Sequence, residues 1–209
     1  MNFSDNQKII FLFSVVILLL LAMTVLIAFD NRNYENEEIP GPYYYISYAF
    51  DPYNLPEITG SSDYVFVAKV NKIDGFIPDS SGFGDSKIIY SVQVVENIKG
   101  ELITGQPIHL LKSGDLSKGG KYYATIAGDF LPESGQTYIF YAYAQPDGLL
   151  STFGDNSALP LTSLNYLEAA SPSSLQNAPE FVEAVEAYQN QIVVYESERS
   201  ISIYDARNY

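Results

Sequence analysis

This chain of 209 residues has no cysteine and only one histidine, and the scarcity of these two residues limits its chemistry. Without cysteine there is no disulfide, no thiol nucleophile and no lipoprotein-type anchor. A metal centre of several histidines is excluded, and a Ser-His-Asp triad would need His109. His109 lies in the apolar segment 107–111, where strand alternation places it opposite Ile108 and Leu110. No nucleophile, metal or cofactor motif accompanies it, so we predict no catalytic residue and no cofactor.

Basic residues are also scarce. The chain holds 11 lysines and arginines against 25 acidic residues, for a net charge of −14. Because phosphates select clustered Lys and Arg, this balance argues against nucleic acid as a partner. It should also keep the folded part away from anionic lipid headgroups. Solubility is the simplest explanation of so acidic a surface.

Residues 9–29 form an apolar run without any charge. As a helix it would be roughly 31 Å long, enough to cross a bilayer's hydrocarbon core. Lys8 and the amino terminus face a downstream flank in which Arg32 is the nearest basic residue, which places residues 1–8 in the cytoplasm. The prediction is therefore a signal anchor in the cell membrane, with a single span and an extracytoplasmic C-terminal domain.

A cleaved signal peptide is the alternative to an anchor. The run is longer than a usual signal core, and its exit at Ala28-Phe29-Asp30 lacks small residues at both expected positions. These features favour retention. Cleavage would leave the compartment unchanged and release the domain.

Residues 30–59 are predicted to form an acidic stalk followed by a tyrosine-rich arm between prolines. Tyrosine is enriched at interfaces, so the arm is a candidate recognition surface. The alternative is an extended arm that buries its rings against the domain, which the usual role of aromatic residues in core packing favours. The interaction candidates are Tyr43, Tyr44, Tyr45, Tyr48 and Tyr53.

Residues 60–160 have the pattern of a barrel of short strands. Residues 64–70 are apolar on both faces, as in a strand buried inside a barrel or sandwich. Residues 88–98 alternate instead. Their apolar face is predicted to carry Ile88, Tyr90, Val92, Val94 and Ile98.

Three further segments are predicted as strands, at 107–111, 121–127 and 137–144, and the last ends at the turn Gln145-Pro146-Asp147-Gly148. Short strands at this spacing predict a mainly β fold with an antiparallel barrel.

In residues 161–209 the spacing of the apolar residues changes from that of a strand to that of a helix. Pro179 suits a first helical turn, and an apolar stripe at helical spacing predicts an amphipathic C-terminal helix that packs on the sheet. That stripe consists of Phe181, Val185, Tyr188 and Ile192.

Segments 62–70, 90–100 and 131–141 occur in an order that resembles a group of bacterial membrane-anchored surface proteins. These proteins have an OB-like barrel similar to the netrin and metalloproteinase-inhibitor module. The resemblance covers roughly residues 60–160 and implies a fold, not a site. Inhibitors of that module chelate the target's zinc through an N-terminal cysteine. This chain has no cysteine, so that mechanism does not carry over.

The loop 79–85 brings Asp79 and Asp85 together with hydroxyls and glycines. Calcium takes such oxygen ligands, which makes the two carboxylates calcium candidates, although the EF-hand spacing is missing. A solvated hairpin loop has the same composition. Beyond these two residues the sequence predicts no metal site.

The sequence predicts a membrane-anchored extracytoplasmic binding or interaction module whose partner is a surface protein or glycan. The alternative is a membrane-anchored extracytoplasmic hydrolase whose site the sequence does not reveal. A Ser-Lys dyad needs no histidine, but Lys112-Ser113 and Ser117-Lys118 are adjacent pairs whose side chains point apart. We therefore predict that the protein is not an enzyme.

Overall fold

The computed structural model describes residues 17, 20, 23, 43–80, 84–152, 154–164, 171–194 and 199–209. Contacts divide the chain into two units, Met1–Pro40 and Gly41–Tyr209. Apart from Ile17, Leu20 and Met23, the predicted cytoplasmic tip, membrane span and stalk lie outside the described residues. Among the residues that are described, no helix is long and apolar enough to cross a membrane.

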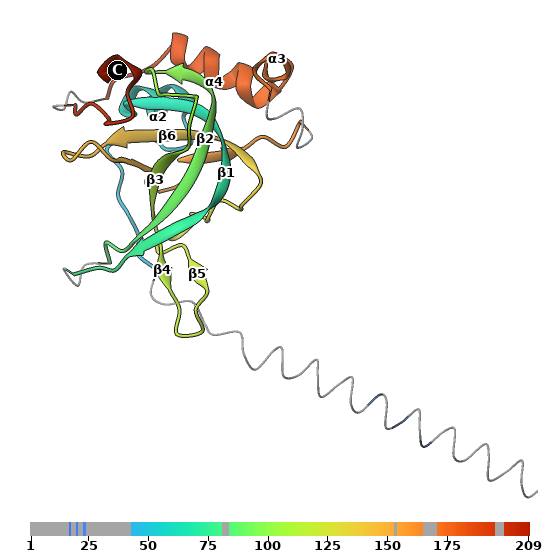
Figure 1. Ribbon diagram of the computed structural model, residues 1–209. Coiled ribbons are helices and arrows are strands. Elements are labelled where there is room, and N and C mark those ends of the chain that lie inside the picture. Colours follow the sequence, from blue (N-terminus) through green and yellow to red (C-terminus); the bar gives the residue numbers. More distant parts are fainter. Residues whose placement is uncertain are drawn as a thin grey trace, which may run out of the picture. The chain divides into compact units, whose positions relative to one another are not determined.

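Five strands of the second unit close into a mixed barrel (Figure 1), in the order β1-β2-β3-β7-β6 with β6 returning to pair with β1. Strands β3 and β7 run parallel, and the other neighbours run antiparallel. The elements are α2 (Leu55–Ser61), β1 (Tyr64–Ile77), β2 (Lys87–Lys99), β3 (Ile108–Ser113), β4 (Asp115–Leu116), β5 (Tyr122–Tyr123), β6 (Thr137–Ala144), β7 (Leu150–Thr152), β8 (Ala158–Pro160), α3 (Pro172–Leu175), α4 (Pro179–Gln189) and the 3₁₀ turn η2 (Ala206–Asn208).

The predicted mainly β barrel is confirmed, but the prediction that it is wholly antiparallel is wrong. In a wholly antiparallel closed barrel the strand directions must alternate all the way round, which an odd number of strands cannot do. One neighbouring pair must therefore run in the same direction. Here that pair is β3 and β7, in which Leu110 lies opposite Leu150.

Strand β1 separates two hydrophobic cores, as its continuous apolar sequence predicts. Phe66, Ala68 and Val70 point into the barrel. Val65 and Val67 point outward, beneath the helices. All five side chains are fully buried, so both faces of this strand stabilise the fold.

Strand β2 follows the predicted alternation for most of its length. Its side chains at Ile88, Tyr90, Val92 and Val94 lie in the barrel interior. Ile98, predicted on the same face, packs against the outer core instead. The pairing of β1 with β2 contains several register shifts, and each bulge moves the following side chains to the other face.

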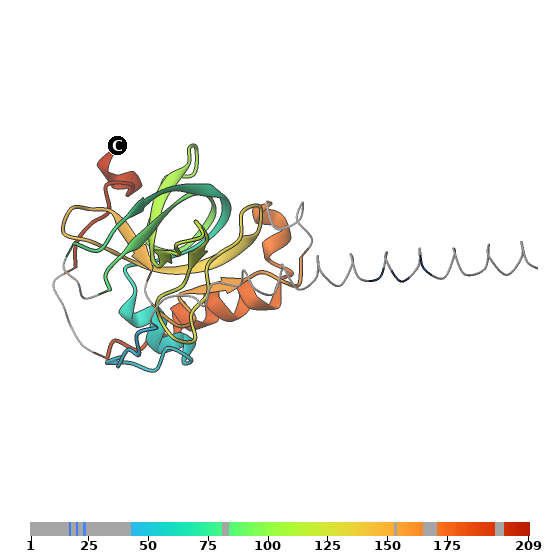
Figure 2. The same cartoon turned by 90° about the horizontal axis from the view of Figure 1, so that it is seen from below.

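Helices α2 and α4 cover the outer face of β1 and β6, and they lie on the same side of the barrel in two views (Figures 1 and 2). Asn54 caps α2 by accepting a hydrogen bond from the Glu57 amide, and a proline stands in the first turn. Gly60 lies directly against the backbone of Ile192, where a Cβ atom would collide with the carbonyl oxygen. The close approach of α2 to the segment after α4 therefore requires a glycine.

The predicted C-terminal helix is confirmed as α4, with Pro179 in its first turn. Its buried stripe is Phe181, Ala184 and Ala187. The prediction that Tyr188 and Ile192 belong to this stripe is wrong, since Tyr188 is 37% exposed and Ile192 lies beyond the end of the helix and is 48% exposed. The two small alanines let the helix approach the outer core closely, and this choice of face turns the larger tyrosine outward.

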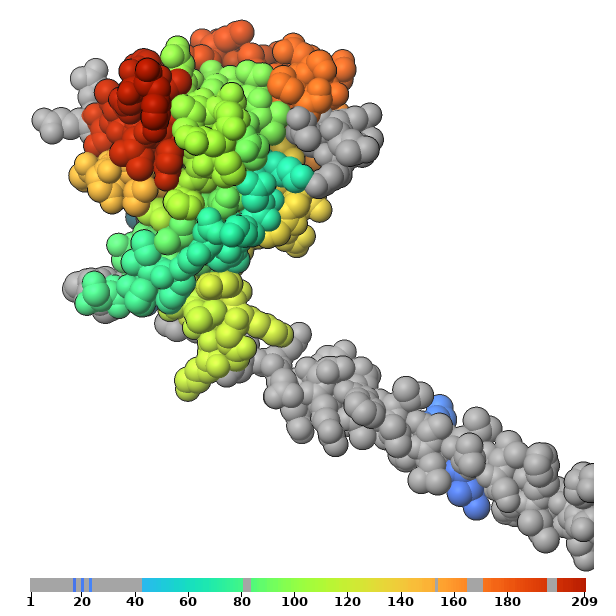
Figure 3. All heavy atoms as spheres, in the orientation of Figure 1, coloured from blue at the N-terminus to red at the C-terminus, as the bar shows by residue number. Residues whose placement is uncertain are grey.

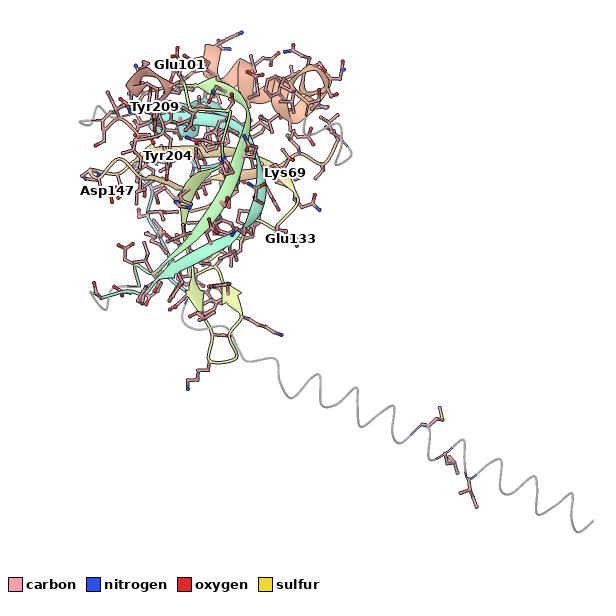
Figure 4. The ribbon with its side chains drawn as sticks, in the orientation of Figure 1. Lys69, Glu101, Glu133, Asp147, Tyr204 and Tyr209 are labelled. Atoms are coloured by element: carbon pink, nitrogen blue, oxygen red, sulfur yellow. The ribbon has the colours of Figure 1, made fainter. Side chains whose placement is uncertain are left out.

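Residues 199–209, whose state the sequence left open, lie along the barrel. The Ile103 amide donates to the carbonyl of Tyr204, and the Ala206 amide donates to that of Glu101. Figure 3 shows this red segment against the green surface of the barrel, and Figure 4 shows Glu101, Tyr204 and Tyr209 on the same side. The C-terminal segment is thus an ordered part of the domain.

Candidate functional site

The tyrosine-rich arm is fixed by its backbone. The Tyr44 amide donates to the carbonyl of Thr125, and the Ala127 amide donates to the carbonyl of Tyr44. Tyr44 lies against Gly84, where there is no room for a Cβ atom, and is 38% exposed. Tyr45 is 92% exposed. The interpretation that the arm buries its rings is therefore wrong at these positions.

The remaining candidates of the arm differ from one another. Tyr43 and Tyr53 are exposed, and the Tyr53 hydroxyl donates to the Asp155 carboxylate at 3.1 Å. Tyr48 is half-buried, and its oxygen accepts a hydrogen bond from the Asp155 amide at 2.9 Å. Tyr48 also lines a concave site of the domain.

That site, which we call the tyrosine hollow, has a volume of about 410 Å³. The arm, helix α2 and strand β6 form its walls, and the side chains of Ser157 and Arg199 complete it. Its wall residues include Tyr48, Phe50, Ile58, Ser61, Tyr141 and Tyr143. A concave, mostly apolar site with a few polar groups is the usual form of a ligand pocket.

Two hydroxyls of the tyrosine hollow have no hydrogen-bond partner among the described residues, Tyr141 Oη and Ser61 Oγ. The Tyr141 side chain is 2% exposed. Burial raises the pKa of its phenol, and an interaction with the neighbouring Thr59 hydroxyl opposes this shift. Buried polar groups normally find partners, so these two unpaired hydroxyls are unusual positions within the described part of the domain.

Behind the tyrosine hollow lies a buried ion pair, which we call the lysine cluster (Lys112, Asp129 and Ser157). The Lys112 ammonium donates to the Asp129 carboxylate at 2.8 Å and to Ser157 Oγ at 3.0 Å. The side chains of Lys112 and Asp129 are each 1% exposed. Burial lowers the pKa of Lys112, and the Asp129 carboxylate counteracts that shift.

The lysine cluster brings a lysine and a serine within hydrogen-bond distance, as the contact between Lys87 Nζ and Ser113 Oγ at 3.0 Å also does. The sequence predicts no Ser-Lys dyad, because Lys112-Ser113 and Ser117-Lys118 are adjacent pairs whose side chains point apart, whereas the fold brings Ser157 to Lys112. However, Ser157 Oγ donates to the Gly154 carbonyl at 2.7 Å, and the serine is 2% exposed. In this geometry the lysine donates to the serine and does not accept its proton.

A second concave site, the basic hollow, has a volume of about 630 Å³. Its cationic lining residues come from β2 and the C-terminal segment: Lys99, Arg199 and Arg207. The two hollows share Asp63, Arg199 and Ser200. The Arg199 guanidinium donates to the Asp63 carboxylate at 2.9 Å, so this ion pair stands between them.

The other sequence candidates are occupied by local partners. His109, half-exposed, lies 3.1 Å from the Asp74 carboxylate on the surface of β1 and β3. Asp79 accepts from the Gly84 amide at 2.6 Å, and Asp85 pairs with Lys87 at 2.6 Å. Nowhere in the described ranges do three acidic or histidine side chains converge. Calcium binding at Asp79 and Asp85 stays a prediction.

The sequence does not predict Arg199, Arg207 or Tyr141 as site residues. One signal was available for the arginines, since they are two of the few basic residues in an acidic chain and both lie in a polar segment without period. In the sequence, nothing distinguishes Tyr141 from the other apolar residues of the predicted strand 137–144. Comparison with known proteins finds no family model that matches the chain and no curated protein that resembles it significantly.

Proposed function

We propose that this protein is a membrane-anchored extracytoplasmic binding module whose ligand enters the tyrosine hollow. One observation carries the proposal: Tyr141 and Ser61 both line this hollow, and the buried hydroxyl of each has no hydrogen-bond partner among the described residues. An unpaired buried hydroxyl costs about 1–3 kcal/mol, which a ligand that supplies the hydrogen bond would recover. The membrane anchor itself rests on the apolar run of residues 9–29.

The ligand class that fits best is a surface protein or glycan. The walls combine aromatic faces with hydroxyl groups, a mixture suited to peptide and sugar surfaces that present both C–H groups and polar groups. The net charge of −14 argues against nucleic acid. The exposed Tyr45 and Tyr53 of the arm offer further aromatic contact area to a large partner.

We further propose that the five-stranded barrel is OB-like, in keeping with the resemblance to membrane-anchored bacterial surface proteins. Its closed strand order with one parallel pair supports this. OB-like barrels commonly serve as binding scaffolds for oligonucleotides and oligosaccharides. Fold alone does not assign a ligand, so the proposal rests on the tyrosine hollow.

The test is binding of the full-length chain, in a lipid nanodisc, to immobilised panels of defined glycans and synthetic peptides. Tyr141→Phe removes only the unpaired hydroxyl, and we expect it to weaken retention of the bound probe about tenfold. Tyr90→Phe is the matched control, because Tyr90 Oη is also buried and unpaired among the described residues but lines neither hollow. Equal binding by the two variants, or no retained probe, would contradict the proposal.

A second function, hydrolysis, would require Lys112 Nζ, which lies 3.0 Å from Ser157 Oγ at the wall of the tyrosine hollow, to lose its proton and accept that of the serine. A hydrolytic serine would react with a fluorophosphonate probe, and mass spectrometry would locate the adduct on Ser157. Ser157→Ala should then abolish labelling. An unlabelled wild-type chain would eliminate this candidate and leave the binding module unaffected.

A further inference from the structure

The basic hollow concentrates positive charge in an acidic protein. Three of the chain's 11 basic residues line it, and Asp63 is its one acidic lining residue among those described. Counting the Asp205 carboxylate that binds Arg207 from behind, three cations face two carboxylates. The local balance is therefore positive, whereas the whole chain carries −14.

The protein holds these cations in place without using all of their donors. Lys99 donates to the Thr59 carbonyl at 2.7 Å and to Gln191 Oε1 at 2.8 Å, which occupies two of its three N–H groups. Asp205 binds Nε and Nη2 of Arg207 and leaves Nη1 outside the pair. Arg207 is also the most open of the cations, with its side chain 61% exposed.

Arg199 is fixed in the same way. Its Nη1 donates to the Ser62 carbonyl at 2.8 Å and to Asp63, and its Nη2 donates to the Gly60 carbonyl at 2.7 Å. Backbone carbonyls orient the guanidinium without cancelling its charge. Its Nε makes no hydrogen bond within the described ranges, so Arg199 still has a donor to offer a ligand.

The environment of Lys99 indicates that its charge is only partly compensated. Burial and then repulsion from Arg199 lower the pKa of Lys99 to about 8, against a smaller opposing effect of Asp63. An anion between the cations would relieve this repulsion. Fixed, partly desolvated donors with net positive charge are what recognition of an oxyanion requires.

We propose that the basic hollow binds an oxyanion, a carboxylate or phosphate group, through Lys99, Arg199 and Arg207. The site stands on these three residues and does not depend on the tyrosine hollow, although a ligand that occupies both would carry its anionic group next to its aromatic or sugar part.

The test is titration of the full-length chain in zwitterionic nanodiscs with inorganic phosphate and, separately, with acetate, followed by calorimetry at constant ionic strength. We expect saturable binding of at least one anion, and the stronger arm identifies its class. Arg207→Gln and Lys99→Gln should each weaken binding about tenfold. Lys72→Gln, which removes an equally charged but 69% exposed residue outside the hollow, should leave binding unchanged.

No saturable binding of either anion, or the same loss in Lys72→Gln, would overturn the proposal. Thermal unfolding of each variant separates loss of the site from loss of the fold, and Lys99→Gln keeps the Asp205 anchor intact if Arg207→Gln loosens the C-terminal segment. The outcome is independent of the glycan and peptide panels, because Tyr141 does not line the basic hollow. Failure of one proposal can therefore be told from failure of the other.

Discussion

The lysine cluster and the basic hollow both hold cations in the same acidic domain, yet the protein treats them differently. Lys112 is 1% exposed and donates hydrogen bonds to Asp129 and Ser157. Arg207 is 61% exposed and keeps one nitrogen outside its ion pair. A charge sealed inside the protein specifies the fold, whereas an open charge with spare donors is available to a ligand.

The largest effect is expected from a substitution in the lysine cluster, which is the buried one of the two sites. Lys112→Met leaves the Asp129 carboxylate buried without a cation, and we expect it to lower the free energy of unfolding by about 3–5 kcal/mol. Urea unfolding of the purified full-length chain measures this. The double variant Lys112→Met/Asp129→Leu should regain most of the loss, since a buried pair is often replaceable by apolar residues. A mild single variant would show that water reaches the cluster.

The next effect separates anchoring from ligand binding at the basic hollow. The fully buried Asp205 carboxylate accepts from Arg207 and, at 2.7 Å, from the Tyr64 hydroxyl. Asp205→Asn weakens these bonds, and we expect a loss of about 1–3 kcal/mol. Hydrogen exchange should locate the loosening in residues 199–209. Uniform loosening of the barrel would contradict the assignment of Asp205 as the anchor of this segment.

A smaller effect on stability is expected at Glu180, an acidic residue that accepts hydrogen bonds from the protein itself. Partial burial raises the pKa of Glu180, but hydrogen bonds from Ser163 and Thr162 outweigh it and lower the pKa to about 2. The unfolded chain binds this proton near its ordinary pKa of 4.5, so stability is present above that pH and is lost as pH falls towards 2.

Glu180→Gln should therefore cost about 1 kcal/mol at pH 7 and remove that part of the acid dependence. Urea unfolding between pH 2 and 7 measures both. Glu186→Gln is the matched control on the same helix, and a parallel change in the two variants would contradict the prediction.

The smallest effect on stability is expected at the open cations. Lys99→Gln should change the free energy of unfolding by less than about 1 kcal/mol. For the wild type, acetate affinity should fall as pH rises through about 8, because Lys99 loses its proton between Arg199 and Asp63 while acetate stays charged. In Lys99→Gln this pH dependence should vanish. A large loss of stability would mean that Lys99 belongs with Lys112 as a structural cation.

Much of the fold could be predicted because strand alternation is local. Segments 64–70 and 137–144 read as strands and are strands. Helix α2 is not predicted, because residues 30–59 are interpreted as stalk and arm, although Asn54 and Glu57 carry the capping signal. The two hollows could not be predicted, since their walls join the arm, α2, β6 and the C-terminal segment, and no period in the sequence records contacts over 100 residues apart.

Arg199 belongs to both hollows and can adopt one orientation at a time. Because the carbonyls of Gly60 and Ser62 and the Asp63 carboxylate hold its guanidinium, ligands in the two hollows would meet the same positive charge. By thermodynamic linkage, any effect of one ligand on the affinity of the other would be matched by an equal effect in return.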